Sequence, residues 1–320
     1  MPRLFISLIA FVFAYQSLLM ADGVAELPVY SKEQTVSGRL RSVGSDSMDE
    51  LMKTWELVFK MEHPELHLFH QGKGSDTAIP LLIEGRVEFG PMSRPLSGEE
   101  LKSFEDKLGK APLQIPVAVD AIAIYVHPGN PVAKQGLSID QLKKIFMSGE
   151  GAAKTWGDVG VTGPLANQSI NLYSRNVVSG TRAVFRKAVL DGADFGEVVP
   201  LPSSKEVVES VAADPLGIGY SSLTYNDGEV ALVPVSKDVG GEPVSPLVDG
   251  VPNRNYPLLR ELFLVVNVVP GDPSGPVKRE FIKFVLSREG QEIVSEHGLM
   301  PVAAADAQRK LKELAALSEG

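Results

Sequence analysis

Cysteine is missing from this chain of 320 residues, and histidine is scarce. Without a thiol, the protein can form no disulfide, no thiolate metal site and no cysteine nucleophile. Two of the five histidines, His67 and His70, lie three residues apart on a predicted strand, where their side chains face opposite sides. The sequence therefore predicts neither a zinc site nor any other bound cofactor.

Basic residues are fewer than acidic ones: 31 lysines and arginines stand against 40 aspartates and glutamates, which gives a net charge of −9. Nucleic acid is not an expected partner, because phosphate backbones are held mainly by clustered lysine and arginine. A small anion is not excluded, since its binding is decided by local donors rather than by the charge of the whole protein.

Long apolar runs are absent except for one near the start, residues 4–20, which follows Arg3. The run ends in small residues that fit positions −3 and −1 of a cleavage site after Ala25. We therefore predict a signal peptide over residues 1–25 and release of a soluble mature protein into a periplasm. An uncleaved membrane anchor is the alternative, because the run approaches the length of a short spanning helix.

Strands and helices alternate through the rest of the chain, as their hydrophobic periodicities predict. The expected strands cover residues 38–44, 67–72, 87–92, 169–174 and 198–201, and the expected helices cover residues 47–61, 75–85, 97–108, 138–147, 179–190, 204–213 and 276–297. This alternation is typical of an α/β fold with a mostly parallel sheet and helices on both faces.

Two extended apolar runs, residues 113–127 and 258–269, are long enough to travel from one domain to another. We interpret them as hinge crossings around an inserted domain, so the expected fold has two lobes. The expected boundaries are residues 37–125 and 256–303 for lobe one, 126–255 for lobe two and 304–320 for a C-terminal tail. That tail, rich in alanine, lysine, glutamate and leucine, is predicted to be a solvated helix or a frayed end.

Three loops share one design, in which a strand ends, a polar segment rich in glycine and serine follows, and a helix begins. They cover residues 43–48, 72–77 and 175–181. A helix start leaves backbone N–H groups unpaired and carries the positive end of the helix dipole, so each loop is a candidate anion site. Simple helix capping is the alternative for any one of them. In open α/β sheets such loops gather at the carboxyl ends of the strands, and we expect the three to converge.

The third loop also carries Arg175, whose guanidinium offers paired donors matched to carboxylate or phosphate oxygens. A surface ion pair is the alternative role for this residue. Four residues later, Ser179, Gly180 and Thr181 open a helix, and this spacing favours a role in anion binding.

With these motifs, the sequence resembles the phosphate-binding proteins of bacterial phosphate ABC transporters, within the type II periplasmic binding-protein fold. The resemblance rests on residues 44–48, residues 72–75 and Arg175 followed by residues 179–181, and it extends in order from about Arg39 to about Val302. It implies a monomer that captures inorganic phosphate between its lobes and passes it to a membrane permease, without enzymatic activity.

The resemblance also implies a ligand set for the phosphate. Ser47 would contribute a hydroxyl, Met48 a backbone N–H and Ser75 a second hydroxyl. Arg175 would pair with the phosphate oxygens, and Ser179, Gly180 and Thr181 would add hydroxyl and amide donors. Ser93 completes the expected set, at a position where well-known members of the family have an aspartate that accepts the proton of the bound phosphate.

The exchange of that aspartate for Ser93 affects selectivity. An acceptor-only carboxylate repels a fully deprotonated oxyanion such as sulfate, whereas a serine hydroxyl accepts without repelling. Arg94 next to it adds attraction or sits at the lobe surface. Asp46 and Asp76 are candidates for a substitute acceptor, with helix capping as their alternative role. Selectivity for phosphate is thus less certain than anion binding.

Three other functions stay open. The ligand could be another tetrahedral oxyanion, such as sulfate or molybdate. A phosphatase on the same scaffold would need a metal cluster or an activated nucleophile, and no recognisable motif supplies a base for Ser179. A surface interaction protein that keeps the fold for adhesion or sensing is the third alternative.

Overall fold

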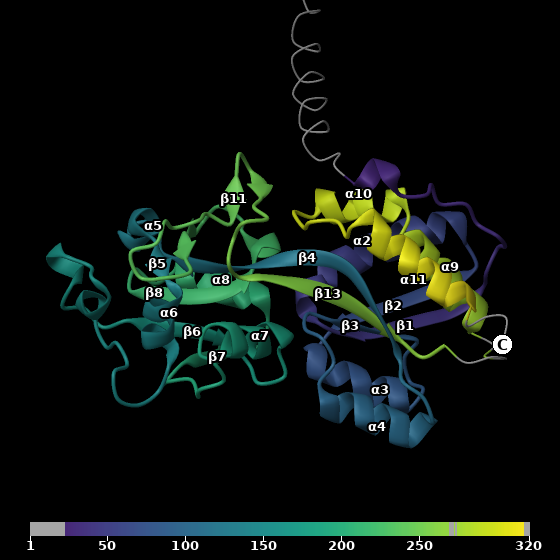
Figure 1. The fold of residues 1–320 in the computed structure, drawn as a ribbon, viewed down its shortest axis with the longest axis horizontal. Helices are drawn as coiled ribbons and strands as arrows, with labels where there is room; N and C mark the ends of the chain where they lie inside the picture. Colours follow the sequence, from purple (N-terminus) through teal and green to yellow (C-terminus); the bar gives the residue numbers. More distant parts are fainter. Residues whose placement is uncertain (1–22, 269–271, 273, 317–320) are drawn as a thin grey trace, which may run out of the picture.

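Two lobes joined by a pair of long strands make up the molecule, which we describe from a computed structural model of residues 23–268, 272 and 274–316 (Figure 1). Nearly all of the predicted signal peptide, residues 1–25, lies outside this described part. Within it, no helix combines the length and apolar character needed to cross a bilayer. The predicted two-lobed α/β architecture is confirmed.

A nine-stranded sheet runs through both lobes in the order β2-β1-β3-β13-β4-β8-β6-β7, with β9 beside β4. Its outer strands are parallel, since β1 pairs with β2 and β3, and β6 pairs with β7 and β8. Its middle strands are antiparallel, because the chain returns between the lobes there. The bounds are β1 Gly38–Gly44, β2 Leu66–Gly72, β3 Phe89–Met92, β4 Leu113–Val126, β6 Asn171–Arg175, β7 Val199–Leu201, β8 Gly217–Ser222, β9 Ala231–Leu232 and β13 Leu259–Val266.

Helices cover both faces of this sheet (Figure 1). The helices of lobe one are α2 Asp49–Glu62, α3 Ala78–Ile83, α4 Gly98–Leu108, α9 Gly275–Val285, α10 Arg288–Glu296 and α11 Ala304–Ala316, and those of lobe two are α5 Val132–Gln135, α6 Ile139–Phe146, α7 Gly180–Ala188 and α8 Ser204–Ala212. Short two-stranded pairings complete lobe two, formed by β5 Leu137–Ser138 with β10 Val235–Ser236 and by β11 Leu247–Val248 with β12 Val251–Pro252.

The two crossing strands, β4 and β13, lie side by side from one lobe to the other (Figure 1). Their antiparallel register shifts at one point: Leu262 pairs with Ala118 and Phe263 with Pro116, so Val117 is an extra residue on β4. Pro116 has no N–H to donate to the ladder, which explains why the irregularity falls there. The predicted extended crossings thus form one continuous pair of strands.

Separate apolar cores lie on either side of this pair. Buried side chains up to Ala118 on β4, and from Leu262 on β13, pack into the cores of lobe one. Those from Ala121 on β4, and up to Leu258 just before β13, pack into the core of lobe two. Both strands therefore change core within the same few residues, which is the position expected for a hinge.

The predicted C-terminal helix over residues 276–297 is instead two helices, α9 and α10. Ser287 between them is extended, and its hydroxyl accepts a hydrogen bond from the N–H of Gly290 at 3.2 Å, which caps α10. A Cβ on Gly290 would lie 2.2 Å from the Phe284 carbonyl oxygen, so only glycine allows this close approach of the two helices. The periodicity of the apolar residues carries no signal for such a contact.

The C-terminal tail contains the predicted helix, but one side of this helix is docked on lobe one rather than solvated. Residues 304–316 form α11, which packs against lobe one with Ala304, Ala307 and Leu314 buried in its main core. The helix is amphipathic rather than wholly polar, so its apolar side packs against α9 and β4.

Candidate functional site

Four hydroxyl groups from separate loops meet where the lobes touch, and we call Ser47, Ser75, Ser93 and Thr181 the hydroxyl cluster. The Oγ atom of Ser47 and the Oγ1 atom of Thr181 are 3.0 Å apart, and the Oγ atoms of Ser75 and Ser93 are 3.2 Å apart. The Ser93 N–H donates to Ser75 Oγ at 3.0 Å. All four residues are buried. Three belong to lobe one and Thr181 to lobe two, so the cluster spans both.

The strand ends of lobe one hold the first three hydroxyls in place. They follow β1, β2 and β3, whose carboxyl ends meet at one edge of the sheet. At this edge Ser45 N–H donates to the Pro91 carbonyl oxygen at 2.7 Å. A Cβ on Gly44 would lie 2.1 Å from that same oxygen, so glycine is required for the first loop to pack against the end of β3.

The start of α7 brings lobe two to the same place. Ser179 caps this helix by accepting the Arg182 N–H at 3.4 Å, and Gly180 is its first residue. A Cβ on Gly180 would lie 2.3 Å from Ser75 Oγ and 2.6 Å from Ser93 Oγ. The first turn of the helix, with its unpaired amides and its positive dipole end, therefore faces the hydroxyl cluster.

Arg175 is fully buried beside the cluster and forms an ion pair between the lobes. Its Nη2 atom lies 2.8 Å from Asp46 Oδ1, and its Nη1 atom donates to Ser204 Oγ at 2.8 Å. The Oδ2 atom of Asp46 accepts from the N–H and the hydroxyl of Ser204 at 3.0 and 2.9 Å. The Tyr225 hydroxyl donates to the Asp46 carbonyl oxygen at 2.7 Å. Asp46 of lobe one is thus held by three residues of lobe two.

A second buried ion pair, Arg260 with Asp120, lies on the crossing strands. The Nε and Nη2 atoms of Arg260 donate to Asp120 Oδ2 at 3.0 and 2.8 Å. The same guanidinium donates from Nη1 to Thr181 Oγ1 at 2.7 Å and from Nη2 to Ser47 Oγ at 3.1 Å. Neither residue was predicted from the sequence. Asp120 is the one charged residue of β4, and Arg260 stands next to Glu261 near the start of β13. A charge inside such an apolar run is the signal that could have revealed them.

Comparison of the chain with known proteins identifies its family. A family model described as the PBP superfamily domain matches residues 30–289. The phosphate-binding protein PstS of Pseudomonas aeruginosa is 41% identical over 294 residues, which is 90% of each chain, and the PstS of Bacillus subtilis is 31% identical over 84% of this chain and 83% of that one. This chain belongs to the PstS family. The resemblance inferred from the three loops is therefore confirmed.

Solved structures of the superfamily share this fold. A putative phosphate ABC transporter substrate-binding protein from Clostridium perfringens, solved with bound phosphate, is 29% identical, with a TM-score of 0.67 over 83% of this chain and the whole of that one. A phosphate transport receptor from Vibrio cholerae has a TM-score of 0.63 at 24% identity, over 82% of this chain and all of that one. At 24% identity, the Vibrio cholerae structure supports the fold alone.

Four other candidate residues have hydrogen-bond or ion-pair partners within the protein: Met48, Arg94, Asp46 and Asp76. The Met48 side chain is buried in the lobe one core, and its N–H donates to the Ser45 carbonyl oxygen at 3.3 Å. Arg94 pairs with Asp76 and Glu100 at 2.5 and 2.7 Å on the lobe surface. Neither Asp46 nor Asp76 caps the short helix in which it lies. Both carboxylates bind arginines, and Asp46 also accepts the N–H of Ser204 at the start of α8.

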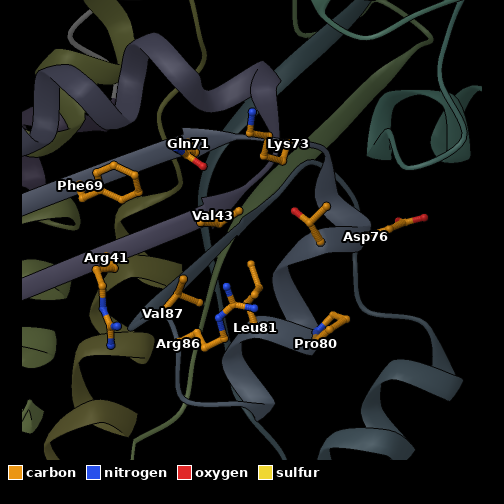
Figure 2. Close-up of a pocket in the computed structure, with 11 residues that line it drawn as sticks. Arg41, Val43, Phe69, Gln71, Lys73, Asp76, Pro80, Leu81, Arg86 and Val87 are labelled. Atoms are coloured by element: carbon orange, nitrogen blue, oxygen red, sulfur yellow. The ribbon is translucent and has the colours of Figure 1, made fainter.

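A groove on lobe one lies away from the hydroxyl cluster. It has a volume of about 630 Å³ and lies over β1, β2 and α3 (Figure 2). Figure 2 shows that Arg41 and Phe69 line it from β1 and β2, and that Lys73 lines it from the loop after β2. These residues point from the sheet face away from the core. The groove shares Lys73, Asp76 and Thr77 with the second loop, and none of the four hydroxyls lines it. Across the described residues, no group of three or more histidine, aspartate and glutamate side chains is placed to hold a metal ion.

Proposed function

We propose that this protein binds inorganic phosphate at the hydroxyl cluster, between its two lobes. The observation that carries the proposal is the convergence of Ser47, Ser75, Ser93 and Thr181, from four loops and both lobes, on the start of α7. Hydroxyls, helix-start amides and a guanidinium are the donors that proteins use for small oxyanions. The names of the curated relatives at 41% and 31% identity support phosphate as that anion.

The proposed ligand set is that expected from the family resemblance. Ser47, Ser75, Ser93 and Thr181 would donate their hydroxyl protons, and Met48, Ser179 and Gly180 would add backbone N–H groups. Arg175 is more constrained than expected, because its contacts to Asp46, Ser204, Pro202 and Leu201 use four of its five N–H groups. One N–H on Nη1 has no partner among the described residues, and we assign it to the phosphate.

Binding would be coupled to closure. The cluster contains donors from both lobes, so an anion contacts the full set only when the lobes are together, and it shifts the population toward that closed form. The chain would then deliver phosphate to the permease of an ABC transporter at the outer face of a membrane, in a periplasm, as a binding protein and not as an enzyme.

Calorimetric titration of the purified protein with phosphate tests the proposal, with sulfate and molybdate as competitors. We expect binding by the wild type and a loss of at least tenfold in affinity for Thr181→Val, which removes one hydroxyl at constant size. Arg186→Ala is the matched control on α7, since the Arg186 side chain binds Ala193 and Asp194 at the surface. If the wild type shows no phosphate binding, or if it binds sulfate equally well, phosphate capture is not its function.

A further inference from the structure

Burying the ion pair of Arg260 and Asp120 carries a large desolvation cost. The side chains are 3% and 0% exposed, and the two residues pair directly across the antiparallel ladder of β13 and β4. Removing two charges from water costs several kcal/mol per ion, and apolar replacements of such pairs are often neutral or stabilising. Fold stability therefore does not account for this pair, and its further contacts point to its role.

Every N–H group of Arg260 has an acceptor. Nε and one N–H of Nη2 bind Asp120, the other N–H of Nη2 binds Ser47 Oγ, and Nη1 binds Thr181 Oγ1 and, at 3.4 Å, the Ser93 carbonyl oxygen. Asp120 is fixed in turn, because its Oδ1 atom accepts the Ser222 hydroxyl at 2.9 Å. The guanidinium is thus locked in one orientation and contacts three of the four segments of the hydroxyl cluster.

These contacts determine the direction of the hydroxyl hydrogen bonds. A guanidinium has donors and no acceptor, so the oxygens of Ser47 and Thr181 must accept from it. A hydroxyl that accepts from one side keeps its own proton for the other side. In this structure one of the two hydroxyls donates its proton to the other at 3.0 Å. Because both oxygens accept from Arg260, both protons can turn toward an anion that lies between the loops.

We propose that Arg260 is a positioning residue that orients the Ser47 and Thr181 hydroxyls as donors to the bound anion, and that Asp120 holds it in place. This inference rests on the proposed function. Arg260 acts only when the lobes are together, because Ser47 belongs to lobe one and Thr181 to lobe two. Asp120 balances its charge, so the contribution is one of orientation rather than of net attraction.

A neutral double variant, Arg260→Gln with Asp120→Asn, tests the proposal without leaving a buried charge unpaired. We expect at least a tenfold loss of phosphate affinity by calorimetry and a faster dissociation rate. The control is Arg41→Gln with Glu88→Gln, which neutralises an ion pair with a similar two-atom contact on the outer side of lobe one. The control should bind phosphate like the wild type.

Coupling to Thr181 separates positioning from mere support of the fold. If Arg260 acts through the Thr181 hydroxyl, Thr181→Val costs less affinity in the neutral double variant than in the wild type. Arg260→Lys, which keeps the charge but loses the planar fork, provides the same comparison if the double variant does not fold. Additive losses, or full affinity in the double variant while the wild type binds phosphate, would overturn the positioning role alone. No binding by the wild type would overturn the proposed function together with it.

Discussion

Gly180 shows how little space separates the lobes at the scale of one residue. Its missing side chain leaves room for the hydroxyls of Ser75 and Ser93, which a Cβ would approach to 2.3 and 2.6 Å. We predict that Gly180→Ala lowers phosphate affinity at least tenfold, because the added methyl group pushes these hydroxyls away from α7. Calorimetry measures the loss. Gly98→Ala, at the start of α4 with nothing within 4 Å of the added Cβ, should leave the affinity unchanged.

Glu56 on α2 offers a prediction about pH. Burial raises the pKa of this carboxyl from 4.5 to about 7, and the nearby charge of Asp49 adds to the rise. Between these two values the folded state binds more protons than the unfolded state, so the carboxyl makes folding less favourable as pH rises through this window. Above pH 7 the penalty is complete, at up to about 3 kcal/mol by the usual conversion of pKa shifts.

We therefore expect Glu56→Gln to stabilise the protein at pH 8 and to have little effect at pH 4.5. Urea unfolding at the two pH values measures the difference in free energy of unfolding. Glu50→Gln, on the exposed side of the same helix, is the control. An equal gain from Glu56→Gln at both pH values would contradict a raised pKa.

Individual site residues differed in how readily the sequence revealed them. Ser47, Ser75 and Thr181 lie in loops that follow strand ends at helix starts. This local pattern was enough to mark the loops as candidates, and the family resemblance implied the role of each residue. The pairing of Arg175 with Asp46 could not be predicted, because the two are 129 positions apart and meet only when the lobes do. Arg260 and Asp120 were missed because strand assignment depends on the apolar majority of a run and passes over the few charged residues in it.

Among the elements, local signals predicted most strands and helices, and tertiary contacts decided the exceptions. The bounds of β1, β2 and α4 agree with the expected ranges to within about one residue. The break between α9 and α10 depends on the close approach at Gly290, and the docking of α11 depends on a surface that only the folded lobe one presents. Neither the break nor the docking can be predicted from the hydrophobic periodicity of the local sequence.

The docked α11 leads to a stability prediction. Leu314 is 2% exposed in the lobe one core, so Leu314→Ala should lower the free energy of unfolding by roughly 2–3 kcal/mol, as for other buried leucines. Phosphate affinity should stay close to that of the wild type, because the helix is remote from the hydroxyl cluster. Lys312→Ala, at an exposed position of the same helix, is the control. If both variants unfold like the wild type, α11 contributes nothing to the fold.

Across the whole molecule, contacts between the lobes reach beyond the cluster. Asp76 N–H of lobe one donates to the Val178 carbonyl oxygen of lobe two at 3.2 Å, and the Tyr225 hydroxyl reaches the Asp46 carbonyl oxygen. Under the proposed closure, such contacts exist only when the lobes are together. They add to the lifetime of the closed form even though they need not touch the anion.

We predict that Tyr225→Phe raises the dissociation rate of phosphate about three- to tenfold, with little change in the association rate. The reason is the loss of one inter-lobe hydrogen bond, worth about 1 kcal/mol. Stopped-flow kinetics measures both rates. Tyr173→Phe is the control, since the Tyr173 hydroxyl binds Asp214 within lobe two. An unchanged dissociation rate for Tyr225→Phe would show that this contact does not hold the lobes together.

The chain enters and leaves lobe two through β4 and β13 alone, and it contains no native cysteine. One engineered thiol on each lobe, at exposed positions such as Leu57 and Val239, would therefore be the sole attachment points for a donor and an acceptor dye. Energy transfer between the two dyes would follow the separation of the lobes directly. The protein could then serve as an optical sensor for its own ligand.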